Sequence, residues 1–476
     1  LPAPLGKAAD ESRPLRIERR PLPAEDGAPA RRESVALSVG NLVSAEGILR
    51  VADGRTTIER AGVGLGDVGV QTPDRPGVFV AGNLKTLDLD RLLPFLTDVA
   101  SQGSGAGAAL TALSLRAGTL TVIGRQFHDV SVKAQFSSAQ TWQATVDARE
   151  MAGEVAWRPE GHGLVTARLK HLAHPDAAHD ALPGAGTATR LPALDVVAER
   201  YLVQGRDLGR LELDAVNEHS GWRLGKLALT APEGAISAQG LWRPGASGEA
   251  DETDLHVTVR ADDAGKYLAR FGQPDTLARG SADIDARVRW RGPISGLDFP
   301  TLNGTVNFRA ERGQFVKLQP GVGRLLGVLS LQSLPRRISL DFNDIFSEGF
   351  AFDTIQGTAT IVRGVARTED LTMVGPAATI AITGQADLAR ETQELAVRVV
   401  PAVGDSVAAA AAVALLNPIV GIGALLAQRL LKDPIGQLLA YQYRVTGPWD
   451  DPKVERVAAP KSAPEPDGLG AKPGPQ

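Results

Sequence analysis

The chain has 476 residues, of which 43% are hydrophobic and 22% are charged, with 52 Gly and 31 Pro. Its 51 Lys and Arg against 55 Asp and Glu give a net charge of −4, so it lacks the basic field that nucleic-acid binding requires. It has no Cys, which excludes disulfides, thiol catalysis and thiolate zinc sites. The length predicts two or three domains or one elongated repeat body, and a chain without Cys suits an oxidising compartment such as a bacterial periplasm.

Both ends of the chain are polar and rich in Pro. We expect a flexible linker at residues 1–32, where Pro alternates with Arg and Glu, and a disordered tail at 458–476. The first residue is Leu, and no signal segment precedes the body. Any targeting or anchoring segment is therefore expected to lie outside this chain.

Between these ends the dominant hydrophobic period is two. Leu255, Val257 and Val259 alternate with polar residues, and the same alternation holds from Arg337 to Phe342. A period of two places the apolar side chains on one face of a strand. Such strands recur about every 8–12 residues between Gly, Pro and Asp turns, which predicts antiparallel meanders with one apolar face.

An internal repeat accompanies this pattern over the predicted β region 33–320. The segment that begins at Gly124 aligns with the one at Gly205, and two Trp pairs follow at offsets of 80 and 85 residues. These pairs are Trp142 with Trp222 and Trp157 with Trp242. Short helical pieces, such as residues 264–271, are expected between units, and a long period built of strands predicts units stacked end to end.

An apolar segment interrupts the β pattern at 401–440. The 23 residues from Ser406 to Gln428 carry no charge, but Asn417 and Pro418 interrupt them, which favours two short helices over one straight span. A helical cap on the sheet and a membrane contact remain open alternatives. The membrane-contact candidates are Val413, Leu415, Leu416, Ile419, Val420, Ile422, Leu425 and Leu426.

No motif in the sequence predicts an active site. The cluster from His171 to Asp180 has zinc-ligand residue types, but its Ala-rich, Pro-containing sequence is typical of a solvated loop. Gly64–Gly69 matches G-x-G-x-x-G, yet the residues that follow cannot begin a helix, so a Gly-rich turn is expected. We therefore expect no catalytic residues, no cofactor and no metal.

Residues 320–400 carry a resemblance. Gly323–Gly327, Ser333–Phe346 and Glu348–Gly357 resemble the C-terminal core of AsmA-like envelope proteins of the YhdP type. The closing segment Tyr441–Pro452 continues the similarity, and the repeats from about residue 35 support it more loosely. The resemblance implies an AsmA-like C-terminal β core at 321–400 and a final strand at 441–457.

The resemblance implies a location and a cargo. Proteins of this type are anchored in the inner membrane of Gram-negative bacteria and extend through the periplasm. Their curled β-sheet forms a hydrophobic groove along which phospholipid is thought to move toward the outer membrane. The implied partners are phospholipids, both membranes and other envelope proteins, and the N-terminal anchor expected of the family is absent from this chain.

The alternation leads to the same fold class, an elongated, curled and mostly antiparallel sheet. Roughly 25 strands spaced about 4.8 Å apart would extend about 120 Å, too far for one apolar face to be hidden in a compact core. Such a sheet must curl over its apolar face, which acyl chains would solvate better than water. Groove lining and ordinary sheet core both remain open for the candidates Ile338, Leu340, Phe342, Phe350, Phe352, Leu395, Val397 and Val399.

Three function classes follow. The first is a periplasmic lipid-transfer conduit that supports the outer-membrane barrier. The second is a periplasmic scaffold for the assembly of outer-membrane components, which would need partner-binding surfaces instead of a continuous apolar track. The third is an envelope glycan enzyme, which the 5% aromatic content disfavours because sugar sites usually need stacking rings.

Overall fold

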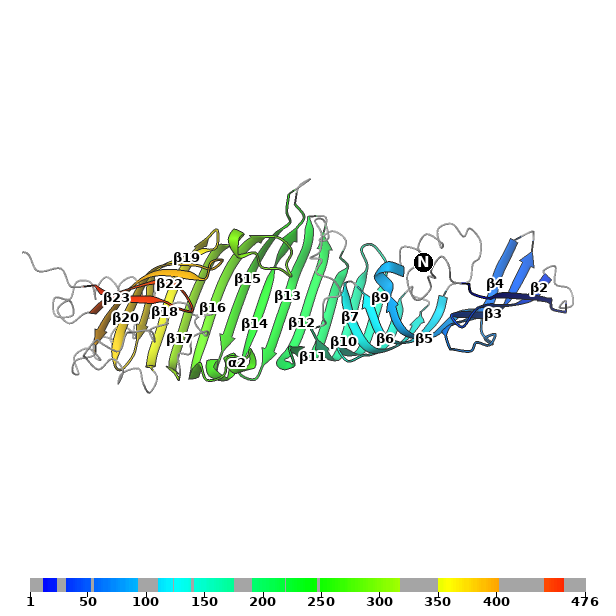
Figure 1. Cartoon of the computed structure of the whole chain (residues 1–476), viewed down its shortest axis with the longest axis horizontal. Coiled ribbons are helices and arrows are strands. Elements are labelled where there is room, and N and C mark those ends of the chain that lie inside the picture. Colours follow the sequence, from blue (N-terminus) through cyan, green and yellow to red (C-terminus); the bar gives the residue numbers. More distant parts are fainter. Residues whose placement is uncertain are drawn as a thin grey trace, which may run out of the picture. The chain divides into compact units, whose positions relative to one another are not determined.

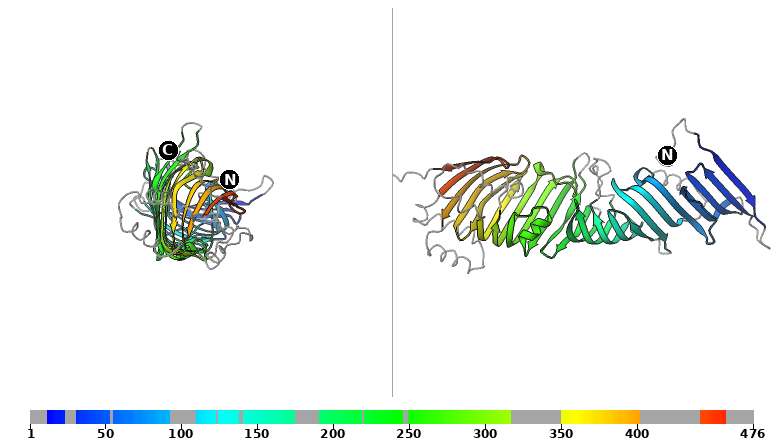
Figure 2. Two further views of the ribbon diagram at one scale, coloured as in Figure 1. Left: turned by 90° about the vertical axis from the view of Figure 1, so that its left-hand side faces the viewer. Right: turned by 60° about the horizontal axis from the view of Figure 1, so that its bottom comes forward.

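The computed structural model describes most of the β region. The described residues are 12–23, 31–52, 55–92, 110–122, 124–137, 141–174, 191–218, 220–245, 249–316, 350–401 and 441–457. They contain 23 strands of one hydrogen-bonded sheet, almost all in antiparallel pairs, and few helices (Figure 1). The predicted class, a mostly β chain with a curled antiparallel sheet, is confirmed, and Figure 2 shows the strands of each part bent into arches.

Two compact units divide the chain, and the boundary passes through α2 and β16. The first unit comprises residues up to Ala261, Ala269–Gly272 and Asp285–Asp298. Its strands are β1 (Leu15–Pro21), β2 (Arg31–Val39), β3 (Val43–Ala52), β4 (Arg55–Gly66), β5 (Gly77–Asp88), β6 (Leu110–Val122), β7 (Arg125–Phe136), β8 (Trp142–Asp147), β9 (Met151–Arg158), β10 (Leu164–Ala173), β11 (Ala193–Val203), β12 (Arg206–Glu218), β13 (Gly221–Ala231), β14 (Gly234–Arg243), β15 (Glu252–Ala261) and the end of β16 (Leu277–Arg291).

The predicted repeat is visible in the pairing of the first unit. Gly124 and Gly205, both with positive φ, form the turns that lead into β7 and β12. Trp142 of β8 pairs with Trp157 of β9, and Trp222 of β13 pairs with Trp242 of β14 in the same way. Each repeat therefore comprises five strands, β6–β10 and β11–β15.

Three pairs in the first unit run parallel, namely β4–β5, β5–β6 and β10–β11. The sequence predicts antiparallel meanders, and a period of two does not encode strand direction. Two of the parallel pairs, β5–β6 and β10–β11, lie where a five-strand repeat begins. The chain thus crosses over between repeats and returns by hairpins within them.

The second unit comprises Asp262–Leu268, Gln273–Ile284 and residues from Phe299 onward. It contains most of the short helix α2 (Ala264–Arg270), which the sequence predicts at 264–271, and the 3-10 helix η2 (Phe299–Thr301). Its strands are the start of β16, β17 (Asn303–Phe315), β18 (Phe350–Val362), β19 (Val365–Val374), β20 (Ala378–Asp387), β21 (Thr392–Pro401), β22 (Tyr441–Pro448) and β23 (Lys453–Val457). The six pairs from β17–β18 to β22–β23 are antiparallel and follow chain order.

Two regions differ from the expected segments. Residues 441–457, expected as one final strand, form the two antiparallel strands β22 and β23. Strand β1 lies within residues 1–32, which the sequence analysis treats as a linker, and pairs along its whole length with β2. Its side chains are mostly exposed, with Leu15 at 62% and Ile17 at 57%, so backbone hydrogen bonding determines this strand more than burial does. No helix among the described residues has the length and hydropathy needed to cross a bilayer.

Candidate functional site

The sheet face that carries the hydrophobic clusters, here called the inner face, holds an unbroken apolar row in the first unit. Cross-strand neighbours contribute one residue from each of β1 to β15, and every one is apolar or Gly. The row is Leu15, Val39, Val43, Leu65, Gly82, Leu115, Val132, Val146, Gly153, Leu169, Ala198, Leu211, Leu229, Ile236 and Val259.

A second apolar row runs beside the first, two residues along each strand. It consists of Ile17, Leu37, Ala45, Val63, Val80, Leu113, Ala134, Ala144, Val155, Ala167, Val196, Leu213, Leu227, Ala238 and Val257. With about 4.8 Å between strands, each row follows roughly 65 Å of sheet. The rows therefore form an apolar track that crosses the strands.

The row between these two lies on the opposite face and is largely polar. It includes Lys133, Glu154, Arg168 and Glu212 together with several Ser and Thr. Arg168 forms an ion pair with Asp195 at 2.7 Å, and both side chains are more than 40% exposed. The pleat therefore separates an apolar face from a solvated one over all fifteen strands.

Burial along the inner face of the first unit is concentrated in three clusters. Leu115 and Val130 belong to one, Leu169 and Leu211 to the next, and Trp222 and Trp242 to the third. The indole Nε1 of Trp242 donates to the Asp251 carboxylate at 3.0 Å, which satisfies both polar groups at the end of the strand. The repeated Trp residues thus lie at one end of the strands, at the edge of the apolar face.

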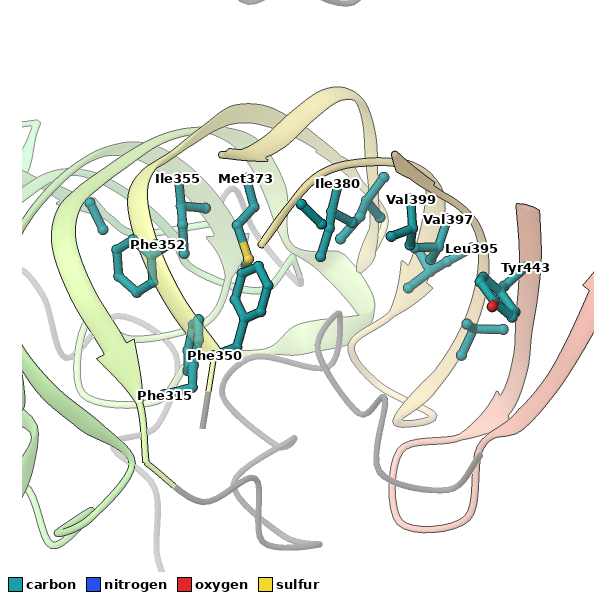
Figure 3. Packing of buried hydrophobic residues seen from close by; sticks show 14 residues of the cluster. Phe315, Phe350, Phe352, Ile355, Met373, Ile380, Leu395, Val397, Val399 and Tyr443 are labelled. Atoms are coloured by element: carbon teal, nitrogen blue, oxygen red, sulfur yellow. The ribbon is translucent and has the colours of Figure 1, made fainter. Parts of the chain in front are cut away.

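The second unit carries its own apolar rows. Ala310, Ile355, Met373, Ile380, Val399 and Tyr441 are successive cross-strand neighbours on β17–β22. A parallel row joins Leu371, Ile382, Val397 and Tyr443. Figure 3 shows six of these side chains inside the arch of the ribbon, namely Ile355, Met373, Ile380, Val397, Val399 and Tyr443.

Five of the eight predicted groove residues lie together in this cluster. Phe350, Phe352, Leu395, Val397 and Val399 are each at most 4% exposed and share one hydrophobic cluster. The rings of Phe315 and Phe352 are 5.3 Å apart in a tilted arrangement, and Gly313 leaves the space that the Phe352 ring occupies. Burial also raises the pKa of the Tyr443 phenol at the far side of the cluster.

The remaining predictions fall outside the described residues. They are the groove candidates Ile338, Leu340 and Phe342 and the membrane-contact candidates Val413, Leu415, Leu416, Ile419, Val420, Ile422, Leu425 and Leu426. Sequence reasoning named no groove residues in the first unit, although the alternation there was visible. The missing information was the register, because only strand pairing shows that the apolar positions align.

A buried polar side chain interrupts the inner face of the second unit. Gln393 of β21 is 5% exposed and lies between Ala386 and Gly447 on the neighbouring strands. Its amide nitrogen and oxygen are both buried, and no hydrogen bond joins either of them to a described residue. The apolar cluster therefore ends at an unpaired amide.

The candidate metal and nucleotide motifs do not form sites among the residues the structure describes. The His171 Nε2 donates to the Arg149 carbonyl at 3.3 Å, and the His174 Nδ1 contacts the Tyr201 hydroxyl at 3.4 Å. No group of three or more potential ligands comes together in the described ranges. Gly64 and Gly66 lie at the end of β4, where no helix follows.

The amino-acid sequence matches the model of a known protein family. A family model described as YhdP protein matches residues 1–454. The chain belongs to the YhdP family. This match confirms the resemblance read from residues 320–452 and extends it over the repeats of the first unit.

A curated relative carries a functional name. The chain is 27% identical over 398 residues to the intermembrane phospholipid transporter YhdP of Escherichia coli strain K12. The aligned region covers 81% of this chain and 31% of that relative, so the chain spans about a third of the length of the relative. No solved structure matches the chain.

Proposed function

We propose that this chain is part of a periplasmic conduit that moves phospholipid along its apolar inner face between the inner and outer membranes, and so supports the outer-membrane barrier. The observation that carries the proposal is the pair of apolar rows that continue without a polar residue across fifteen strands. A scaffold would need no such continuity. The family relative's name, an intermembrane phospholipid transporter, supports the same cargo.

The rows suit an acyl chain because they bind it favourably and still allow it to move from one strand to the next. Each buried CH₂ contributes about 0.8 kcal/mol, so a whole lipid tail on the inner face is held firmly. Successive strands offer similar Val, Leu and Ala contacts, so a shift by one strand exchanges one set of contacts for an equivalent set. The protein therefore acts without chemical catalysis, and the direction of transport is supplied from outside this chain.

A conduit of this kind has defined partners and a defined cellular compartment. The partners are phospholipids, the two membranes and other envelope proteins, and the compartment is the periplasm of a Gram-negative bacterium. The chain without Cys agrees with that compartment.

The test is lipid mass spectrometry on the chain purified from bacterial membranes in mild detergent. We expect several phospholipids per chain in the wild type and a marked loss in Val146→Asp, which places a charge in the first apolar row. Val146 is half-buried, so this change is compatible with folding. The matched control is Thr145→Asp, which places the same charge on the opposite, exposed face of β8.

Circular dichroism and thermal unfolding of both variants separate loss of lipid from loss of fold. A lipid-free wild-type chain, or equal lipid content in two folded variants, would overturn the conduit. A polypeptide recovered in stoichiometric amount with a lipid-free chain would instead support the assembly scaffold.

A further inference from the structure

A pocket of about 700 Å³ lies on the outer face of the second unit, opposite the apolar cluster. Two cross-strand rows form its floor, Thr360–Arg367–Gln385 and Val362–Val365–Asp387, and both alternate with inward-facing residues such as Ile361. The residues Pro300, Arg363, Ala389 and Arg390 complete the wall. The pocket volume is in the range of small-ligand sites, which is about 300–1,000 Å³.

The charged residues that line this pocket are mostly positive. The lining contains three Arg residues, Arg363, Arg367 and Arg390, and one acidic residue, Asp387, so its formal net charge is +2. Arg367 donates to the neutral Gln385 amide at 3.1 Å, so no described residue neutralises its charge. Arg390 contacts Asp387 at 3.2 Å but is 82% exposed, and Asp387 also accepts from two backbone amides of its own turn.

Arg363 has a backbone conformation that is unfavourable for Arg. Arg363 and Gly364 form a hairpin turn in which both residues have a positive φ, 48° and 77°. In turns of this kind the first of the two residues is usually Asn, Asp or Gly. The turn is held firmly, because the Arg363 amide donates to Asn303 at 3.1 Å and the Gly364 amide donates to the Leu302 carbonyl at 2.8 Å. No hydrogen bond or ion pair joins the guanidinium to any described residue.

Strained residues held by their surroundings are concentrated at functional sites, and Arg is the side chain suited to bidentate recognition of phosphate. Val362, which is 53% exposed, lies with Pro300 and Val365 beside the guanidinium groups and offers contact to the carbon part of a ligand. We propose that this outer pocket binds a phosphate group carried on a small organic or lipid molecule. The site is separate from the apolar inner face and does not depend on the conduit.

The test compares two arginine variants of the full chain. Arg363→Gly removes a pocket guanidinium and relieves the strained φ, so we expect an unchanged or higher unfolding midpoint together with about a tenfold or greater loss of affinity. Arg312→Gly is the matched control, because Arg312 of β17 has a φ of 51°, is 78% exposed and does not line the pocket. Asp387→Asn, which keeps an acceptor for the turn, should tighten binding.

Two probes distinguish the source of the phosphate. Calorimetric titration with glycerol phosphate tests a free phosphate ester, and flotation with phosphatidylcholine vesicles, with and without equimolar phosphatidylglycerol, tests a lipid head group. The site is supported if the wild type binds either probe, Arg363→Gly binds it more weakly and Arg312→Gly binds it as the wild type does. Absence of binding to both probes, or equal affinity of the two glycine variants, overturns it. Lipid held on the inner face affects both variants alike and cancels in the comparison.

Discussion

At the scale of single residues, the inner face of the second unit combines close packing with a buried amide, that of Gln393, that has no hydrogen-bond partner among the described residues. A buried amide without a hydrogen-bond partner has lost its hydration and gained nothing in exchange. Gln393 is in this position, whereas Gln442 on the neighbouring strand β22 has the same side chain on the exposed face. The two residues allow the effect of burial to be measured apart from the effect of residue type.

Replacement of the buried amide by an apolar group of similar size should stabilise the protein. We expect Gln393→Leu to raise the free energy of unfolding by about 1–3 kcal/mol, because the lost desolvation penalty is of that size. Urea unfolding measures the change. The control Gln442→Leu should stay within about 0.5 kcal/mol of the wild type. A destabilised Gln393→Leu would show that the amide has a partner outside the described residues.

Packing around Phe352 gives a second prediction at this scale. A Cβ at Gly313 would overlap the Phe352 ring and lie 2.9 Å from its Cε1 atom, and that ring is only 2% exposed. We expect Gly313→Ala to lower the free energy of unfolding by about 1–3 kcal/mol, since a packed ring has little room to move. Gly69→Ala, where no atom lies within 4 Å of the new Cβ, is the control and should be nearly neutral. Equal stability of the two variants would show that the Phe352 ring is free to shift.

At the scale of elements, the short helix α2 depends on the residue that precedes it, Asp263. The Asp263 carboxylate accepts from the Lys266 backbone amide at 3.0 Å and caps the helix. That hydrogen bond, together with the Lys266 side chain, lowers the pKa of Asp263 below its ordinary value of 3.8. Because the folded state favours the ionised form, this contribution is present above pH 3.8 and is lost as the pH falls through the lowered pKa.

Removal of the cap should therefore have a pH-dependent effect. Asp263→Ala should destabilise the chain by about 1 kcal/mol at pH 7, and the difference from wild type should shrink at an acid pH, below the lowered pKa of Asp263. Asp263→Asn keeps an acceptor for the amide but has no charge to titrate, so its stability should change less between these pH values. Urea unfolding at both pH values measures the difference, and a constant difference would rule out the carboxylate as the source.

The elements also show what sequence alone can predict. Apolar alternation identified strands such as Glu252–Ala261, and the Trp pairs located the repeat, because both depend on local periodicity. Strand direction and register depend on pairing partners far along the chain, so the parallel pairs and the continuous rows could not be predicted. The outer pocket was missed because its Arg residues occupy outward positions that resemble ordinary solvated ones. Arg363 before Gly364 was the available signal, since it stands where a hairpin turn usually has Asn or Asp.

At the scale of the whole molecule, the hydrophobic clusters are distributed between the two units. The cluster that contains Phe352 and Val397 belongs wholly to the second unit, and the three others belong to the first. Stacked repeats are stabilised mainly by contacts with their nearest neighbours. A local defect in one unit should therefore open that unit without opening the other, which allows lipid contacts in one part to persist while another part rearranges.

The buried Trp242 provides the test of this independence. Trp242→Phe removes the donor to the Asp251 carboxylate and some ring volume, so we expect a loss of about 1–3 kcal/mol in local stability. Hydrogen exchange should then accelerate in β13–β15 and remain unchanged in β18–β21. Trp449→Phe is the control, because the Trp449 indole N–H has no hydrogen-bond partner among the described residues. Faster exchange of similar size in both units after Trp242→Phe would show that the sheet unfolds as one cooperative body, and the separation of the clusters would then have no energetic meaning.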